Sequence, residues 1–163
     1  RAIRSPPALA AEYGELGVHY EVLHHTQLID ELLKDRRIPL QTKAAMTEHV
    51  TFHDPCYLGR YLREFDAPRN VLVHIGAKNT EMERHKASSF CCGAGGGRIF
   101  LEEHIGTHVN EERTKQAMAT GATTVAVGCP FCKSMIVDGT KALDVEDKLT
   151  VKDVAELVAE RLA

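Results

Sequence analysis

The sequence predicts an α/β fold with a mainly parallel sheet flanked by helices and with cysteine-bearing loops gathered at the strand ends. Short β-prone runs alternate along the chain with segments of helical periodicity, which is typical of a layered α/β architecture. Cysteines follow closely after two of these runs, and sites in open α/β sheets gather outside the carboxyl ends of strands. With 163 residues, 44% of them hydrophobic and 26% charged, the chain suits one globular domain with one core.

The start of the chain predicts no regular element, because it is rich in proline and alanine. We expect residues 1–17 to form a linker or N-terminal extension and residues 18–163 to form the cysteine-bearing domain. A short strand is expected within residues 17–23. A helix should follow, with Thr26 as its cap and an apolar stripe that ends at Leu33. The chain does not begin with methionine, so we expect it to be an excised piece of a longer polypeptide.

The middle of the chain is divided by its turn residues. The expected elements are a strand at 50–53, a helix at 58–65, a strand at 71–75 and a loop at 91–97. The first strand ends at an Asp-Pro turn signal directly before Cys56. Ala67 and Pro68 are expected to close the helix, and Gly76 to stop the second strand. The loop is expected because four glycines in five positions sustain a helix or strand poorly.

The last third of the chain predicts two helices around a buried strand, and then a final helix. The expected elements are a helix at 107–120, a strand at 123–127, a helix from the second cysteine motif to about 137, and a helix after Thr150. Gly121 should end the first of these helices. Gly128 follows the strand, which therefore delivers Cys129 and Cys132 to the carboxyl edge of the sheet.

The composition excludes several classes of function. A net charge of −3, from 20 basic and 23 acidic residues, gives no basic surface for nucleic acid. No apolar run reaches the ~18–20 residues of a membrane-spanning helix, so we expect no direct membrane insertion of this fragment. The first residues carry no apolar stretch behind their charges and do not resemble a signal peptide. We therefore expect a cytoplasmic location.

The five cysteines form the strongest functional signal. Cys56 is followed after 34 residues by the adjacent pair Cys91 and Cys92, and after 36 more by Cys129 and Cys132 in a Cys-x-x-Cys motif. An odd, clustered set without a secretion signal argues against a disulfide framework and favours a metal site or redox-active thiols. The Cys-x-x-Cys motif alone is shared by zinc sites, iron–sulfur sites and redox dithiols.

The adjacent pair favours a polynuclear metal group over a single ion. Neighbouring side chains diverge from one backbone point, so both bind one small tetrahedral ion only with strain, but they can reach different metals of a larger cluster. Five thiolates around one Zn²⁺ would also leave about three uncompensated negative charges in a partly buried site. Sulfur ligands select thiophilic metals, with iron–sulfur groups and zinc leading.

The glycines beside the pair fit the same interpretation. Gly93, Gly95, Gly96 and Gly97 would let the main chain pass close to a bulky inorganic group, with free amides that donate to sulfur. If Cys129 lies at a strand end and Cys132 begins a helix, the helix dipole favours their thiolate forms.

The motifs resemble the cysteine-rich CCG domain of heterodisulfide reductases and their relatives. The residues that carry the likeness are 53–61 (His-Asp-Pro-Cys-Tyr-Leu-Gly-Arg-Tyr), 66–69 (Asp-Ala-Pro-Arg), 91–98 (Cys-Cys-Gly-Ala-Gly-Gly-Gly-Arg) and 128–132 (Gly-Cys-Pro-Phe-Cys). The sequence directly after Cys56, Tyr-Leu-Gly-Arg-Tyr, is most similar to the C-terminal domain of membrane-associated iron–sulfur oxidoreductases that link electron-transfer flavoprotein to quinone. The likeness covers roughly Val18 to the C-terminus.

The resemblance implies a cofactor, a set of ligands and partners. It implies a noncubane 4Fe–4S cluster held by Cys56, Cys91, Cys92, Cys129 and Cys132. It also implies an electron-transfer domain of an oxidoreductase, working with other domains or subunits and with electron-transfer flavoprotein at the cytoplasmic face of a membrane. Some related domains with altered motifs bind zinc, whereas this chain keeps all five cysteines.

Three alternatives stay open. The domain could reduce a disulfide substrate, as the heterodisulfide relative does. It could be a zinc-bound structural domain of the same family. Cys129 and Cys132 could also form a thiol–disulfide switch, although this leaves the other three cysteines unexplained.

Other residues near the cysteines have ordinary structural explanations beside a functional one. His53 could donate to the cluster or accept a coupled proton, or simply bond a nearby backbone group. Arg60 and Arg98 could offset the cluster charge or be solvated surface residues. Tyr57 and Phe131 could shield the cluster from water or only pack.

Overall fold

Four parallel strands form the central sheet of the computed structural model, which describes residues 2–3, 17, 21–41, 48–101 and 104–163. The strand order is β4 (Lys78–Asn79), β3 (His49–His53), β5 (Thr124–Val127), β6 (Thr150–Asp153). The predicted α/β class with a parallel sheet is confirmed. β3 and β5 are neighbours in register, with His53 opposite Val127, so both strands end at the same level of the sheet.

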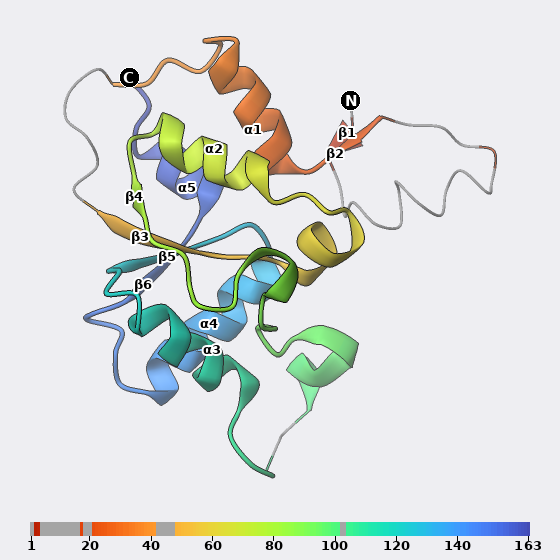
Figure 1. The fold of residues 1–163 in the computed structure, drawn as a ribbon, viewed down its shortest axis with the longest axis vertical. Helices are drawn as coiled ribbons and strands as arrows, with labels where there is room; N and C mark the ends of the chain where they lie inside the picture. The colour runs from red at the N-terminus through yellow and green to blue at the C-terminus, as the bar shows by residue number, and fades with distance from the viewer. Residues whose placement is uncertain (1, 4–16, 18–20, 42–47, 102–103) are drawn as a thin grey trace.

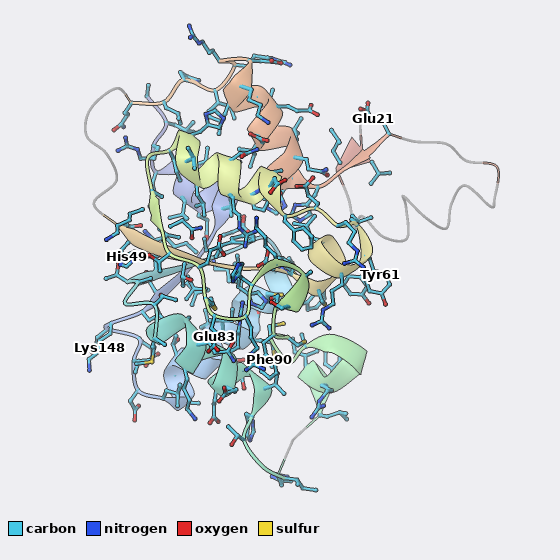
Figure 2. All side chains as sticks on the ribbon, viewed as in Figure 1. Glu21, His49, Tyr61, Glu83, Phe90 and Lys148 are labelled. Atoms are coloured by element: carbon cyan, nitrogen blue, oxygen red, sulfur yellow. The ribbon has the colours of Figure 1, made fainter. Side chains whose placement is uncertain are left out.

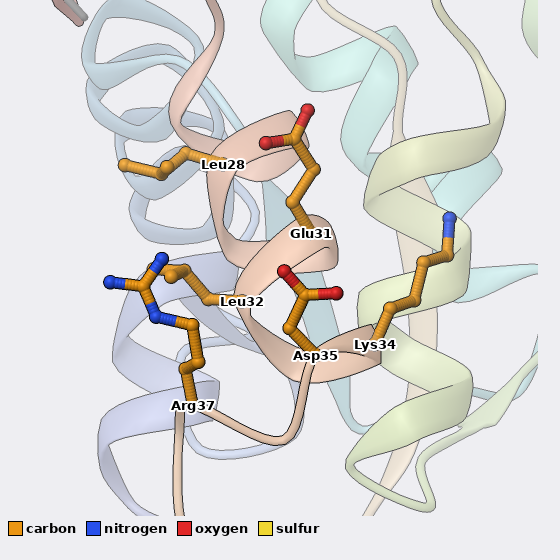
Figure 3. A pocket seen from close by; sticks show the side chains of 6 residues that line it. All are labelled: Leu28, Glu31, Leu32, Lys34, Asp35 and Arg37. Carbon is orange, nitrogen blue, oxygen red and sulfur yellow. The ribbon is translucent and has the colours of Figure 1, made fainter.

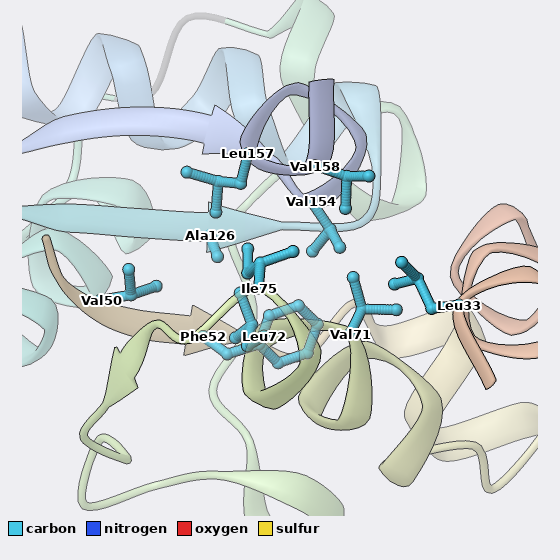
Figure 4. Packing of buried hydrophobic residues seen from close by; sticks show 10 residues of the cluster. All are labelled: Leu33, Val50, Phe52, Val71, Leu72, Ile75, Ala126, Val154, Leu157 and Val158. Carbon is cyan, nitrogen blue, oxygen red and sulfur yellow. The ribbon is translucent and has the colours of Figure 1, made fainter. Parts of the chain in front are cut away.

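Helices cover both faces of the sheet (Figure 1). One face carries α1 (His25–Lys34), α2 (Asp66–His74) and α5 (Val154–Ala159), and the other carries α3 (Val109–Met118) and α4 (Pro130–Ala142). Because side chains alternate across a strand, β5 contributes Ala126 to one core and Val125 and Val127 to the other. The core under α1, α2 and α5 is drawn in Figure 4 and consists of Leu33, Val50, Phe52, Val71, Leu72, Ile75, Ala126, Val154, Leu157 and Val158.

The second core, under α3 and α4, contains two of the cysteines. Its buried members are Met82, Cys92, Ala117, Val125, Val127, Cys132, Ile136 and Leu149. The two helices approach closely at Gly139, where an added Cβ would lie 2.9 Å from the carbonyl oxygen of Asn110. This close contact fixes the position of α4, which carries Cys132 in its first turn.

The strand expected at 71–75 is wrong, because these residues belong to α2. Val71, Leu72 and Ile75 are buried at a spacing that lies on one helical face. Pro68 stands in the first turn, where its missing N–H costs nothing. Ala67 and Pro68 therefore begin a helix instead of closing one. The helix expected at 58–65 is a single wide turn, Tyr57–Tyr61.

The end of the chain also departs from the expected pattern. Thr150 begins β6 and does not cap a helix. The cap of α5 is Asp153, whose carboxylate accepts from the amide of Ala155 at 2.9 Å. The helix after the Cys-x-x-Cys motif extends beyond 137 to Ala142. The buried strand over 123–127 and the polar helix ending before Gly121 are confirmed in β5 and α3.

The start of the chain contributes a short strand pair, and one expected helix cap differs. Ala2–Ile3 forms β1 and pairs in parallel with β2 (Val22–Leu23). Apart from Ala2, Ile3 and Gly17, the expected linker at 1–17 lies outside the described residues, and the domain boundary stays a prediction. The cap of α1 is His24 and not Thr26, with the imidazole accepting from the amide of Thr26 at 3.3 Å.

Candidate metal centre

Three segments carry the five cysteines to one end of the sheet. Cys56 follows β3 after Asp54 and Pro55, and Cys129 follows β5 after Gly128. Because these strands are adjacent, parallel and in register, the two cysteines leave the same edge. Cys129 is the N-cap of α4. The pair Cys91 and Cys92 comes from the loop before the glycine-rich turns at Gly95–Phe100.

The five sulfur atoms form one continuous series of hydrogen-bonded neighbours. The series runs Cys56, Cys91, Cys92, Cys132, Cys129. A ring nitrogen of His53 and the sulfur atoms of Cys92 and Cys132 all lie within 4.8 Å of one another. The structure therefore brings all five predicted cysteines, and His53, into one site.

Main-chain amides surround the sulfur atoms. The amide of Gly93 donates to Cys91 Sγ at 3.3 Å. The other sulfur-directed amides belong to Tyr57 (to Cys56), Gly95 (to Cys91), Ala94 (to Cys92), and Phe131 and Cys132 (to Cys129). Amides that donate to sulfur favour the thiolate over the thiol, so the loops are arranged for negatively charged sulfur.

The expected glycines serve different purposes. Gly93 is buried with φ +98°, and an added Cβ would lie 3.2 Å from Met135 Cε and from Val109 Cβ. Gly96 is exposed and has nothing within 4 Å of an added Cβ. Its positive φ of +66°, and not a close approach to another group, explains the choice of glycine at this position. Gly95 has open space as well and contributes its amide.

Two of the thiols are held as thiolates. Hydrogen bonds donated by the thiols of Cys56 and Cys92 hold the pKa of Cys91 well below its usual range. The thiol of Cys132, with the amides at the start of α4, lowers the pKa of Cys129 to about 6 despite burial. Cys91 and Cys129 are therefore the charged members of the set near neutral pH.

The other three cysteines keep their protons. The hydrogen bond to Cys91, followed by burial, raises the pKa of Cys56. The hydrogen bonds to Cys129 and Cys92, followed by burial, raise the pKa of Cys132. The bond from Cys132 lowers the pKa of Cys92, but the bond to Cys91 and burial together raise it to about 11. A metal that bound all five sulfurs would displace these three protons.

The donor set fits a polynuclear, sulfur-ligated metal group. Five soft sulfur donors suit thiophilic metals and exceed the four ligands of a structural zinc ion.

Asp54, the acidic residue nearest to a cysteine in the sequence, forms an ion pair with Arg69, with N···O distances of 2.8 and 2.9 Å. Lys86 donates its amide to the same carboxylate at 2.7 Å. Asp54 thus ties the Cys56 segment to the segment that leads to Cys91.

His53 presents a proton donor and not a free lone pair. Arg113 donates from Nε to His53 Nδ1 at 2.9 Å. Burial, followed by the charge of Arg113, lowers the pKa of His53 to about 3, so the ring is neutral. A neutral imidazole whose Nδ1 accepts carries its proton on Nε2. While the Arg113 bond is intact, His53 therefore does not act as a metal ligand.

Two buried residues at the site were not predicted. Arg113 is a polar residue within an expected helix, and its partner His53 is 60 positions away. His24 donates from Nε2 to the carbonyl of Gly128 at 2.9 Å and contacts Thr26 Oγ1 at 2.7 Å through Nδ1. His24 thereby holds the residue before Cys129. Burial, followed by the neighbouring His25, lowers the pKa of His24 to about 4.

The expected arginines and aromatic residues lie at the margin of the site. Arg60 donates to the carbonyl of Ser89 at 2.6 Å, and Arg98 is exposed. Phe131 is 58% exposed and Tyr57 56% exposed, so neither is sealed in the core. Tyr57 stacks on Tyr61, with 5.2 Å between ring centroids, and Tyr61 points away from the body of the molecule in Figure 2.

A separate hollow of about 650 Å³ lies along α1 (Figure 3). It is lined by Leu28, Glu31, Leu32, Lys34, Asp35 and Arg37. These side chains offer no sulfur, and the hollow is on the α1 side of the sheet. It is therefore not part of the cysteine site.

Comparison with known proteins finds one matching family and several related oxidoreductases. A family model described as the cysteine-rich domain CCG matches residues 50–137, which include all five cysteines. The chain is 44% identical to a probable iron-sulfur-binding oxidoreductase, FadF, of Bacillus subtilis, over 91% of this chain and 21% of that protein. It is 39% identical to the EtfAB:quinone oxidoreductase of Syntrophomonas wolfei, over 93% of this chain and 22% of that protein.

A third relative comes from Methanosarcina mazei. The chain is 44% identical to one subunit of the dihydromethanophenazine:CoB–CoM heterodisulfide reductase of that organism, over 88% of this chain and 34% of that protein. The chain thus spans about a fifth to a third of the length of these relatives. Within the described part of the chain, no helix has the length and apolar character needed to cross a bilayer.

Proposed function

The chain belongs to the cysteine-rich CCG family, and from this membership we propose that it is an iron–sulfur electron-transfer domain of a larger oxidoreductase. The observation that carries the proposal is the single series of five sulfur atoms at the carboxyl edge of β3 and β5. The names of the relatives, which include iron–sulfur and quinone oxidoreductases, support it.

We further propose that the cluster is a noncubane 4Fe–4S group with five thiolate ligands. The ligands would be Cys56, Cys91, Cys92, Cys129 and Cys132. A cubane cluster takes four cysteines, so it would leave one of this series unused. When bound, the cluster supplies a site that takes up and releases an electron.

The protein's own residues would hold and tune that group. The amides of Gly93 and Gly95 donate to the sulfur of Cys91, and donation to sulfur favours the more negative, reduced state. Cys129 at the N-cap of the 13-residue helix α4 meets the positive end of the helix dipole, which favours the same state.

The length of the relatives, of which this chain spans only part, supports partners within a larger oxidoreductase. We propose that other domains or subunits of the same oxidoreductase exchange electrons with this domain, and that electron-transfer flavoprotein is the donor. One relative is called a probable membrane-anchored ferredoxin, which supports association with a membrane through the rest of the protein. We propose that this domain lies at the cytoplasmic face of that membrane.

The proposal is tested by anaerobic purification of the chain after expression with iron supply. Iron and acid-labile sulfide should be present at about four of each per chain, the composition of a 4Fe–4S group. Electron paramagnetic resonance should show a signal that changes on oxidation or reduction. The matched variant Cys56→Ser should lose iron and sulfide. Stoichiometric zinc without iron or sulfide in the parent chain would refute the proposal.

One observation favours zinc as a second candidate. His53, Cys92 and Cys132 offer nitrogen and sulfur donors within 4.8 Å, which is a zinc-like ligand set. Against it, His53 Nδ1 already accepts from Arg113, so zinc binding to His53 would require that bond to break. Metal analysis of the parent chain distinguishes the two candidates directly.

A further inference from the structure

A fully buried arginine lies beside the cysteine site. Arg113 of α3 is 0% exposed. Its guanidinium donates to His53 Nδ1 at 2.9 Å, to the carbonyl of Arg84 at 2.9 Å, to Gln116 Oε1 at 3.0 Å and to Ser89 Oγ at 3.4 Å. All four acceptors are uncharged. The hydrogen bonds therefore satisfy the guanidinium without neutralising it.

The charges that face Arg113 include the cysteines. Asp54, Cys132 and Cys92 favour its charged form, whereas Arg84 opposes it. Burial lowers the pKa of Arg113 to about 10, so the group stays cationic near neutral pH. A buried cation is costly unless negative charge lies near it. Cys92 and Cys132 would supply such charge once they bind a metal group as thiolates.

The bond to His53 also has a direction. Arg113 Nε can only donate, so His53 Nδ1 must accept and Nε2 must carry the proton. Because one ring nitrogen of His53 lies within 4.8 Å of two cysteine sulfurs, the ring is held against the site in a single tautomer. Arg113 thus acts on the site through its charge and through His53.

We propose that Arg113 is a positioning residue of the cysteine site: it holds His53 as an Nε2–H donor and places a fixed positive charge on the buried side of the sulfur atoms. The proposal rests on the proposed iron–sulfur function. A fixed cation stabilises the reduced cluster, which carries one more negative charge, so Arg113 raises the reduction potential. The sequence distance of 60 residues hides this role from motif analysis.

The test compares Arg113→Gln and Arg113→Lys with the parent chain. Arg37→Gln is the control, because Arg37 is exposed and lines the hollow on the α1 side of the sheet. The first readout is the midpoint potential of the cluster, from an anaerobic titration followed by electron paramagnetic resonance. The second is the ¹⁵N chemical shift of the His53 ring nitrogens in the metal-free, reduced chain, which reports the tautomer.

Arg113→Gln should lower the midpoint potential and bring the two His53 nitrogens toward an averaged shift. Arg113→Lys should restore most of the potential, because the positive charge returns. The Arg37→Gln variant should match the parent in both readouts.

The inference fails if Arg113→Gln holds iron and sulfide as the parent does and leaves the potential and the His53 shifts unchanged. If Arg113→Gln does not fold, Arg113→Met replaces it as the uncharged variant that cannot donate to His53, and an unchanged potential with unchanged His53 shifts in that variant overturns the inference. If the parent takes up no iron, the proposed function fails, while the His53 shifts still test the hold of Arg113 on the ring.

Discussion

Replacing Gly93 by alanine should destabilise the chain through its backbone and its packing together. Gly93 has φ +98°, a conformation that costs an L residue about 1–2 kcal/mol. The added Cβ would lie 3.2 Å from Met135 Cε and Val109 Cβ, and crowding of this kind adds about 1 kcal/mol. The lower entropy of the unfolded chain returns roughly 0.5 kcal/mol. The expected net loss is about 2 kcal/mol.

Urea unfolding followed by circular dichroism measures this loss. With an m value of about 2 kcal/mol per molar urea, the midpoint should fall by about 1 M. Gly95→Ala is the matched control. It lies in the same loop, keeps its amide donor to Cys91, has no positive φ, and has nothing within 4 Å of an added Cβ. Its midpoint should change by less than about 0.3 M, which corresponds to an ordinary surface substitution.

The reasoning is refuted if Gly93→Ala and Gly95→Ala unfold at the same urea concentration. In that case neither the left-handed backbone nor the contact with α3 and α4 would limit the residue at this position. The loop would then tolerate a side chain where the structure leaves no room for one.

Three other predictions concern protonation and charge. The pKa of His24 is lowered to about 4 in the folded chain, so its contribution to stability should be complete above about pH 6.5 and fall by about 3 kcal/mol as pH drops toward 4. His24→Gln should remove this contribution, while the pH dependence from buried His53, whose pKa is lowered to about 3, should remain. Arg69→Met should cost roughly 3 kcal/mol in urea unfolding, because it leaves the buried Asp54 carboxylate without its cation. In the metal-free, reduced chain at pH 7, iodoacetamide should modify Cys129 well before Cys132, as mass spectrometry of timed samples can show.

Each of these predictions has a contrary result. The His24 account is wrong if parent and variant lose equal stability between pH 7.5 and 4.5. The Arg69 account is wrong if Arg69→Met is no less stable than Arg37→Met, which removes an exposed cation. Equal rates of modification at Cys129 and Cys132 would show that the start of α4 does not separate their pKa values.

The site was easier to predict than the elements around it. Cysteine chemistry and spacing are local properties, and so is the turn signal that ends β3 before Cys56. They were enough to predict that the five cysteines meet. In contrast, Val71, Leu72 and Ile75 are β-prone residues, and only their burial against Phe52 and the rest of that core makes them one face of α2. A short apolar run does not distinguish a strand from a buried helix by itself.

The amino-acid sequence alone determined the α/β class, the cysteine set and the family, because residue type, periodicity and motif spacing are written along the chain. The tertiary structure decided the strand order β4–β3–β5–β6 and the buried partners of the site. Arg113 meets His53 across 60 residues, and His24 meets Gly128 across 104. Such contacts arise only when strand pairing and helix packing have brought distant segments together, so no local pattern reports them.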